Sequence, residues 1–262
     1  MNEQMHERRP DGGQPGTAVP DGGQADPRLE QLRERLAAVR ERIGNAAAAA
    51  GRAESPPQLI VVTKFHPEED VRRLAALGVT DVGENRDQEA SEKAAALAGL
   101  DLRWHFIGQL QSNKAKSVVK YAHAVHSVDR LQLAGALAKA MAAEHERTGR
   151  APLECFIQVS LDDHADGHRG GALPADVPEL AAQLAGSAGI RLAGVMAVAP
   201  FGADPLPAFE KLAEVSARLT AVHPEATGIS AGMSQDLEQA VRWGATHLRV
   251  GSDILGPRPA LR

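Results

Sequence analysis

A lysine at the end of an apolar run is the residue of this sequence best suited to covalent chemistry. The strand-like stretch 59–62 (LIVV) is followed by Thr63 and Lys64, and Pro67 then opens a stretch rich in acidic residues. An ammonium group is costly to bury unless it is paired or loses its proton. Two interpretations are open. Either the Lys64 stem packs on the rim of the fold with its ammonium in water, or the amine lies in a partly apolar pocket and forms a Schiff base with an aldehyde.

Two polar loops near the end of the chain could bind a phosphate group. "TGISAGMSQDLEQAV" (227–241) places Ser230, Gly232 and Ser234 before a predicted helix, and "RVGSDILG" (249–256) places Gly251 and Ser252 after a predicted strand. Backbone N–H groups at such positions bind anions, although ordinary turn and capping chemistry gives the same pattern in either loop alone. The two loops together predict a phosphate site.

Arg249 bears on what kind of molecule carries the phosphate. A reactive lysine facing a phosphate loop fits pyridoxal phosphate (PLP), and it also fits a class I aldolase that holds a sugar phosphate. An arginine aimed at a pyridine nitrogen would keep that nitrogen unprotonated and make the ring a poorer electron sink. Arg249 lies two residues before Gly251, so it could serve this purpose, or it could simply pair with a carboxylate.

The elements that must position these residues alternate along the chain. Strand-like runs and amphipathic helical stretches follow one another, which predicts an α/β chain folded as a single TIM-type (β/α)8 barrel with its site at the carboxyl ends of the strands. A doubly wound open sheet is the alternative, and no Gly-rich dinucleotide motif supports it. The predicted strands are 59–64, 80–83, 103–108, 124–128, 153–160, 190–198, 227–230 and 246–251. The predicted helices are 67–77, 86–98, 111–121, 129–148, 174–187, 204–223 and 234–243.

The first part of the chain differs in composition from the rest. Residues 1–26 are rich in Gly, Pro and Gln, and "PDGGQ" occurs twice, which predicts a disordered tail before a barrel domain at 27–262. Asp26 and Pro27 have the types expected at a helix start. The apolar residues from Leu29 to Ile43 then recur at helical spacing, which predicts an extra N-terminal helix.

Composition excludes several classes of function. The formal net charge is −5, so we expect no nucleic-acid partner and no binding to an anionic membrane. No stretch has the roughly 18 apolar residues that a membrane span needs. The single cysteine, Cys155, lies in an apolar run, which predicts a buried inert thiol and a reducing, cytoplasmic setting. His164 and His168 share one polar loop without a third ligand, so we expect no metal site.

Six stretches of the sequence resemble, in order, the motifs of the pyridoxal phosphate homeostasis proteins. The resemblance covers residues 30–258 and implies the barrel fold of the alanine racemase N-terminal domain, without the second β domain. It departs at 160–171, "SLDDHADGHRGG", where Arg169 stands near a lysine common in relatives. The stretches are "VVTKFHPEED", "GENRDQEA", "RWHFIGQLQSNKAK", "HSVDR", "GMSQDLEQAV" and "RVGSDILGPR".

The resemblance implies a role for each matching residue. Lys64 would form the internal aldimine with PLP, and Arg249 would face the pyridine nitrogen. Around the phosphate, the resemblance places Ser230, Gly232, Met233, Ser234, Gly251 and Ser252. In the rest of the cofactor pocket, it places Asn85, His105 and Met196.

The expected function is non-catalytic PLP binding for intracellular PLP homeostasis, by buffering or delivery to PLP-dependent apo-enzymes. A racemase needs an acid or base on each face of the ring. Tyr121, the one tyrosine, lies in a predicted helix away from the strand ends, and the second domain is missing. A weak PLP-dependent racemase or a Schiff-base aldolase is the alternative, and a scaffold protein that binds through its tail is a third possibility. We expect a monomer.

Overall fold

The strands form a closed parallel barrel in sequence order, as predicted. The computed structural model describes residues 26–161, 170–200 and 202–257, and within these ranges eight strands pair from β1 through β8 and back to β1. The pairing of β1 with β8 joins Ile60 to Arg249 and Val61 to Val250, so the Lys64 end of β1 lies beside the end of β8. The strands are β1 Gln58–Val62, β2 Asp81–Glu84, β3 Arg103–Phe106, β4 Ala122–Val128, β5 Leu153–Gln158, β6 Ile190–Met196, β7 Gly228–Ser230 and β8 His247–Val250.

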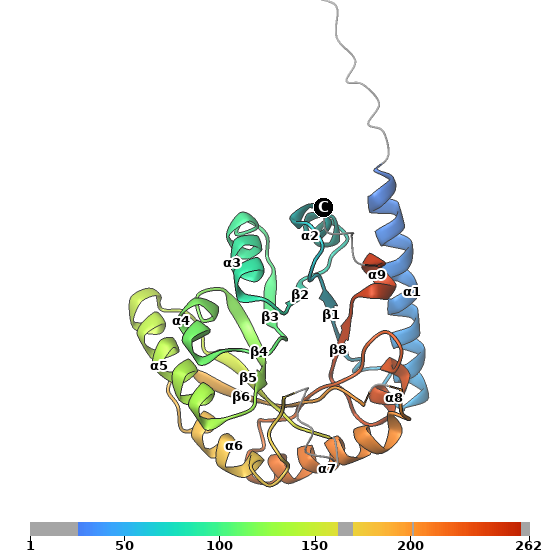
Figure 1. Cartoon of the computed structure of the whole chain (residues 1–262). Helices are drawn as coiled ribbons and strands as arrows, with labels where there is room; N and C mark the ends of the chain where they lie inside the picture. Colours follow the sequence, from blue (N-terminus) through green and yellow to red (C-terminus); the bar gives the residue numbers. More distant parts are fainter. Residues whose placement is uncertain (1–25, 162–169, 201, 258–262) are drawn as a thin grey trace, which may run out of the picture.

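Helices surround the barrel on its outside (Figure 1). They are α1 Pro27–Ala49, α2 Glu68–Ala76, α3 Asp87–Ala96, α4 Ala115–Val118, α5 Leu131–Thr148, α6 Val177–Ala185, α7 Leu206–Val222, α8 Leu237–Arg242 and α9 Ser252–Leu255, with a 3₁₀ turn at Ser112–Lys114. Two predicted helices differ clearly from this. The helix expected at 111–121 is the 3₁₀ turn followed by the single turn α4. The helix expected from 234 begins at Leu237, because the backbone N–H of Met233 donates to Asp236 Oδ1 at 2.6 Å and closes a turn first. The short α9 was not predicted.

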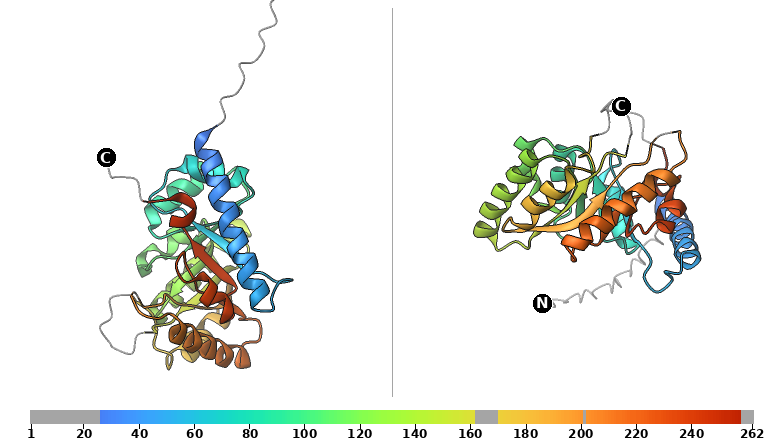
Figure 2. Two further views of the ribbon diagram at one scale, coloured as in Figure 1. Left: turned by 90° about the vertical axis from the view of Figure 1, so that its right-hand side faces the viewer. Right: turned by 90° about the horizontal axis from the view of Figure 1, so that it is seen from below.

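The extra N-terminal helix is present as α1. Asp26 caps it by accepting hydrogen bonds from the backbone N–H groups of Arg28 (2.9 Å) and Leu29 (3.3 Å), and Pro27 occupies the first helical position. Figures 1 and 2 show α1 running along the β8, α8 and α9 side of the barrel. Each large aliphatic side chain that it buries there contributes roughly 2 kcal/mol. Its buried residues are Leu32, Leu36, Val39, Ile43 and Ala47.

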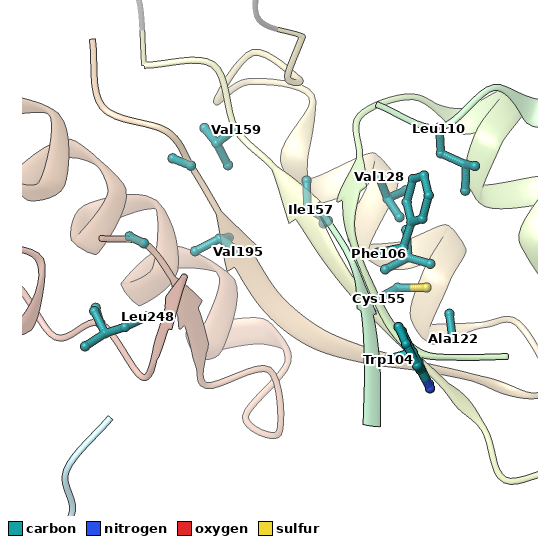
Figure 3. Packing of buried hydrophobic residues seen from close by; sticks show 14 of the residues in the cluster. Trp104, Phe106, Leu110, Ala122, Val128, Cys155, Ile157, Val159, Val195 and Leu248 are labelled. Atoms are coloured by element: carbon teal, nitrogen blue, oxygen red, sulfur yellow. The ribbon is translucent and has the colours of Figure 1, made fainter. Parts of the chain in front are cut away.

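Alternate strand residues form two different layers. Most of those that point outward are apolar and belong to the core under the helices, among them Trp104, Phe106 and Cys155 (Figure 3). Burial raises the pKa of the Cys155 thiol, as expected for an inert cysteine. Residues of the opposite parity point into the barrel and include His105 and Arg249, both nearly inaccessible to solvent. The barrel interior is therefore partly polar, unlike the layers of branched aliphatic residues that usually fill such a barrel.

Some sequence predictions concern residues beyond these ranges. The tail up to residue 25, His164, His168 and Arg169 lie outside the described residues. Within the described part, no group of His, Cys, Asp or Glu side chains has the arrangement of a metal site. None of the described helices combines the length and the apolar character that a membrane span requires.

Candidate functional site

A cavity of ≈ 610 Å³ lies at the carboxyl ends of the strands, within the usual range for a small-molecule site. It brings together six of the predicted site residues, which come from three separate parts of the chain. They are Lys64, Met233, Ser234, Arg249, Gly251 and Ser252. The cavity wall also includes Val62, Phe65, His66 and Ile107, and on the far side residues 199, 200, 202, 203 and 205.

Lys64 lies in a strained turn directly after β1. The next residue, Phe65, has a φ of 67°, which costs free energy in a bulky residue and persists only where neighbours enforce it. Two contacts do so: the Phe65 backbone N–H donates to Glu89 Oε1 at 2.7 Å, and the guanidinium of Arg86 lies 5.1 Å from the Phe65 ring centroid. The turn therefore places Lys64 in the cavity wall.

The buried ammonium group of Lys93 in α3 stabilises this turn through three hydrogen bonds. Lys93 Nζ donates to Thr63 O at 3.0 Å and to Glu84 Oε1 and Glu89 Oε1 at 2.7 Å each. Glu84 Oε1 also accepts from the Thr63 hydroxyl at 2.7 Å. Burial raises the pKa of Glu84, and the Lys93 ammonium opposes that rise. Sequence reasoning missed Lys93, because its spacing of four from Glu89 is also that of an ordinary surface ion pair.

The two predicted phosphate loops meet on the other side of the cavity. Ser234 Oγ and Ser252 Oγ lie 3.1 Å apart although they are 18 residues apart in sequence. Gly232 has a φ of +93°, and a Cβ at this position would lie 2.7 Å from the Cβ of Ala240. Glycine is therefore required here, since it lets the loop turn back tightly onto α8. The paired hydroxyls and the backbone around Gly251 form a polar corner suited to an anion.

Arg42 of α1 ties both loops to the N-terminal helix. Its guanidinium donates to the carbonyl oxygen of Ser234 at 3.0 Å, to Asp253 Oδ2 at 2.7 Å and to Glu238 Oε1 at 2.9 Å. The hydrogen bond to Glu238 raises the pKa of Arg42 above its ordinary value. The helical stripe predicted α1 but gave no sign of this role, because Arg42 lies on its more exposed side.

Arg249 reaches the cavity from inside the barrel. It is 4 % exposed, and its guanidinium donates to Ser230 Oγ at 2.6 Å and to the carbonyl oxygen of Ala197 at 2.8 Å. The alternative interpretation was pairing with a carboxylate. Among the described residues Arg249 makes no such ion pair, and its two hydrogen-bond partners are neutral. Burial lowers the pKa of Arg249 to about 10, so the group stays cationic at neutral pH.

Four predicted residues lie away from the cavity wall or behind it. His105 is buried inside the barrel and lines a second cavity of ≈ 210 Å³ at the opposite mouth. Met196 packs in a small interior cluster that includes Phe156. Ser230 is completely buried beneath Arg249. Asn85 follows β2, and its Oδ1 is buried without a hydrogen-bond partner among the described residues.

Tyr121 lies outside the cavity, as predicted. Its hydroxyl donates to Asp87 Oδ1 at 3.2 Å on the outer side of the barrel. The titratable cavity residue that sequence reasoning missed is His66. It is 7 % exposed and its Nδ1 lies 3.9 Å from Asp70 Oδ2. Burial lowers the pKa of His66, so its imidazole is neutral at pH 7.

The fold and the site together define a barrel of the alanine racemase N-terminal type. The family described as "Alanine racemase, N-terminal domain" matches residues 34–259. Alanine racemase from Corynebacterium glutamicum has the same fold with a TM-score of 0.64 at 15 % identity, over 89 % of this chain and 63 % of that protein.

Closer relatives are the pyridoxal phosphate homeostasis proteins, and this chain belongs to their family. The protein of that name from Mycobacterium tuberculosis strain H37Rv is 44 % identical over 247 residues, which is 88 % of this chain and 94 % of that protein. The one from Escherichia coli K12 is 33 % identical over 236 residues, covering 88 % and 98 %. PipY of Synechococcus elongatus PCC7942, solved with PLP bound, matches with a TM-score of 0.73 at 35 % identity, over 86 % of this chain and all of PipY.

Proposed function

We propose that this chain binds PLP without turning over a substrate, holds it as a Schiff base on Lys64, and serves intracellular PLP homeostasis by buffering or delivering the cofactor. The observation that carries the proposal is the cavity itself. One wall supplies an amine, another supplies two hydroxyls and a glycine-bordered turn, and Arg249 adds a buried guanidinium. Membership of the family and the PLP-bound structure of PipY support it.

The donor set fits each functional group of PLP. When bound, PLP supplies an aldehyde that an amine can capture, and Lys64 is the amine in the cavity wall. Ser234, Ser252 and the backbone at Gly251 would receive the phosphate, with Met233 beside them and Gly232 shaping the loop. Arg249 carries only N–H donors, so it would hydrogen-bond an unprotonated pyridine nitrogen. This disfavours carbanion chemistry, because a protonated ring is the better electron sink.

The residues behind the cavity wall would act indirectly. Ser230 contacts Arg249, and we propose that it positions the guanidinium. For His105 and Met196, which lie inside the barrel, and for Asn85 on the β2 loop, we propose roles in shaping the pocket floor. Their substitution should weaken PLP binding less than substitution of Lys64.

The first experiment compares the visible absorption of purified protein before and after borohydride reduction. The proposal expects a Schiff-base band that reduction bleaches, with the pyridoxyl group found on the peptide containing Lys64 by mass spectrometry. Lys64→Ala should lack the band, whereas Lys116→Ala, which removes an exposed lysine on α4, should keep it. A wild-type protein that stays colourless with added PLP would refute the proposal and favour an aldolase, which would form its Schiff base only with a sugar phosphate.

A second candidate is a weak PLP-dependent racemase, and the location of His66 favours it. A neutral imidazole in the cavity wall could serve as the second acid or base that the sequence did not offer. Incubation of the PLP-loaded protein with single amino-acid enantiomers decides between the two. Turnover lost in both Lys64→Ala and His66→Asn would establish an enzyme, and absence of turnover supports the binding role.

Transfer to PLP-dependent apo-enzymes, a monomeric state and a cytoplasmic location stay predictions. Light scattering of the purified protein measures the mass of the particle in solution. Mixing the PLP-loaded protein with an apo-enzyme, in the presence and absence of a trap for free PLP, would separate direct transfer from release into solvent.

A further inference from the structure

A chain of hydrogen bonds runs through the barrel interior and ends on Arg249 in the cavity wall. His105 Nε2 lies 2.9 Å from Asp81 Oδ1, and His105 Nδ1 lies 3.0 Å from His126 Nε2. His126 Nδ1 lies 2.8 Å from Ser230 Oγ, which accepts from Arg249 Nη1 at 2.6 Å. The residues come from five strands, β2, β3, β4, β7 and β8. Together they connect the amino-terminal end of the barrel to the cavity at the carboxyl ends of the strands.

With both histidines neutral, the two ends of the chain allow only one direction of hydrogen bonding. Arg249 has donors and no acceptor, whereas an ionised Asp81 has acceptors and no donor. Ser230 and each neutral histidine have a single proton to donate. Every link is therefore satisfied only when Arg249 donates to Ser230, Ser230 to His126, His126 to His105 and His105 to Asp81. Both histidines must then carry their proton on Nε2.

The surroundings of Asp81 favour its ionised form. Although the carboxylate is buried, hydrogen bonds from His105, from Arg103 at 2.6 Å and from Thr80 at 2.8 Å hold the pKa of Asp81 well below its ordinary value. Gln58 Nε2 adds a further donor at 2.7 Å. These contacts favour the ionised carboxylate, so Asp81 acts as the acceptor at this end of the chain of hydrogen bonds.

The surroundings of the histidines favour their neutral forms. His126 is completely buried and stacked on Phe156, with ring centroids 4.4 Å apart and planes inclined by 11°. Burial lowers the pKa of both His105 and His126. The charged or titratable groups that face His126 are His105, Arg249, His247 and His123, and each of them opposes an added positive charge on its ring.

We propose that His126 is a positioning residue for the cofactor site: by accepting the Ser230 proton, it makes Ser230 present a lone pair to Arg249 and so fixes the guanidinium in the cavity wall. The proposal rests on the proposed function and deepens it. His126 lines no part of the cavity, so it acts through two intermediates. Without an acceptor at His126 Nδ1, the Ser230 hydroxyl is free to rotate, and its lone pair is no longer held toward Arg249. Arg249 then keeps its hydrogen bond to the Ala197 carbonyl, while the shorter one to Ser230 weakens.

The first test needs no cofactor. Protein labelled with ¹⁵N-histidine is examined by NMR at neutral pH, where the ring nitrogens distinguish both tautomers and the imidazolium. The proposal expects His126 and His105 as neutral rings protonated on Nε2, assigned by comparison with His126→Phe and His105→Phe. An Nδ1-protonated or doubly protonated ring at either position would overturn it.

The second test measures PLP affinity in matched variants. His126→Phe keeps the ring stacked on Phe156 but has no acceptor, whereas His126→Asn places an amide oxygen near the position of Nδ1. Loss of one hydrogen bond to a charged group corresponds to about tenfold weaker PLP binding in His126→Phe. We expect His126→Asn to stay within about threefold of wild type, because the acceptor is restored. The absorption band of the bound cofactor should shift in His126→Phe and not in His126→Asn.

Ser230→Ala provides a check that does not depend on the histidine. It removes only the hydroxyl, so it should reproduce the tenfold loss even if His126→Phe folds poorly, as judged by circular dichroism. Wild-type affinity in folded His126→Phe or in Ser230→Ala would refute the positioning role while leaving PLP binding on Lys64 intact. If the wild-type protein itself fails to bind PLP, the proposed function is wrong. The histidine tautomers seen by NMR still decide whether the hydrogen bonds run from Arg249 to Asp81.

Discussion

Lys93→Met would leave a buried carboxylate beneath the Lys64 turn with no cation to face. The ammonium of Lys93 contacts Glu84, Glu89 and the Thr63 carbonyl, and the side chain of Glu84 is only 1 % exposed. Glu84 Oε2 has no hydrogen-bond partner within the described part of the chain, so Oε1 carries the compensation for its burial. Methionine matches the length of the lysine stem and removes the charge without opening a large cavity.

The loss of stability follows from how Glu84 can respond. Removing one partner of a buried ion pair costs about 3–5 kcal/mol when the other stays charged. Glu84 can instead take up a proton, which from an ordinary pKa of 4.5 costs about 3 kcal/mol at pH 7. That cost is an upper limit, because burial already raises the pKa of Glu84 in the folded protein. We therefore expect Lys93→Met to lower the free energy of unfolding by about 2–3 kcal/mol at pH 7.

Urea unfolding followed by circular dichroism measures this difference, with Lys116→Met as a control for removal of an exposed lysine. The penalty should shrink toward pH 5, since protonation of Glu84 becomes easier by about 1.4 kcal/mol per pH unit. The double variant Lys93→Met/Glu84→Gln should be more stable than Lys93→Met, because neither charge remains. A loss below about 0.5 kcal/mol, or a penalty that does not change with pH, would refute the assignment of Lys93 as the buried counter-ion of Glu84.

Three further predictions concern other parts of the barrel. Gly232→Ala should destabilise the protein by roughly 2 kcal/mol in urea unfolding, because the backbone is left-handed and the new Cβ would lie 2.7 Å from the Cβ of Ala240; Gly99→Ala, with open space around it, should change little. Burial holds the pKa of His247 at about 4, against 6.5 ordinarily, so the unfolded chain is protonated first as the pH falls. Stability should therefore drop between pH 6.5 and 4, and His247 alone contributes about 3 kcal/mol of this loss, which His247→Phe should abolish. Cys155 is buried, so a thiol reagent should modify it only after unfolding, and rapid modification of the native protein would contradict the packing shown in Figure 3.

Much of the fold was predictable because the strands and helices of a barrel alternate, and each type produces its own spacing of apolar residues in the sequence. Apolar strands between amphipathic helices gave the closed order β1 to β8, and the stripe from Leu29 to Ile43 gave α1. The errors fall where a side chain overrides helical periodicity. The hydrogen bond from Met233 N–H to Asp236 delays α8 by three residues, and the segment from 111 forms only a 3₁₀ turn and one helical turn.

For the site, the sequence by itself determined which residues would meet at one mouth of the barrel. Lys64, Arg249 and the loops around Ser234 and Ser252 were recognisable because each stands at the end of a predicted strand, and parallel strands of a barrel deliver their ends to one mouth. Family motifs strengthened the same choice without giving the geometry. They could not show which of the remaining motif residues face the cavity.

Only the tertiary structure decided what holds those residues in place. The support of the Lys64 turn by Lys93, the tie from Arg42 to both loops and the chain from Asp81 to Arg249 join residues from separate elements. These hydrogen bonds are 2.6–3.0 Å long. Apart from the Glu89–Lys93 pair, they join residues that lie 9 to 211 positions apart in sequence, so no local pattern specifies them. Periodicity records which face of a strand or helix is buried, whereas hydrogen-bond partners across a barrel are set by the register of every strand between them.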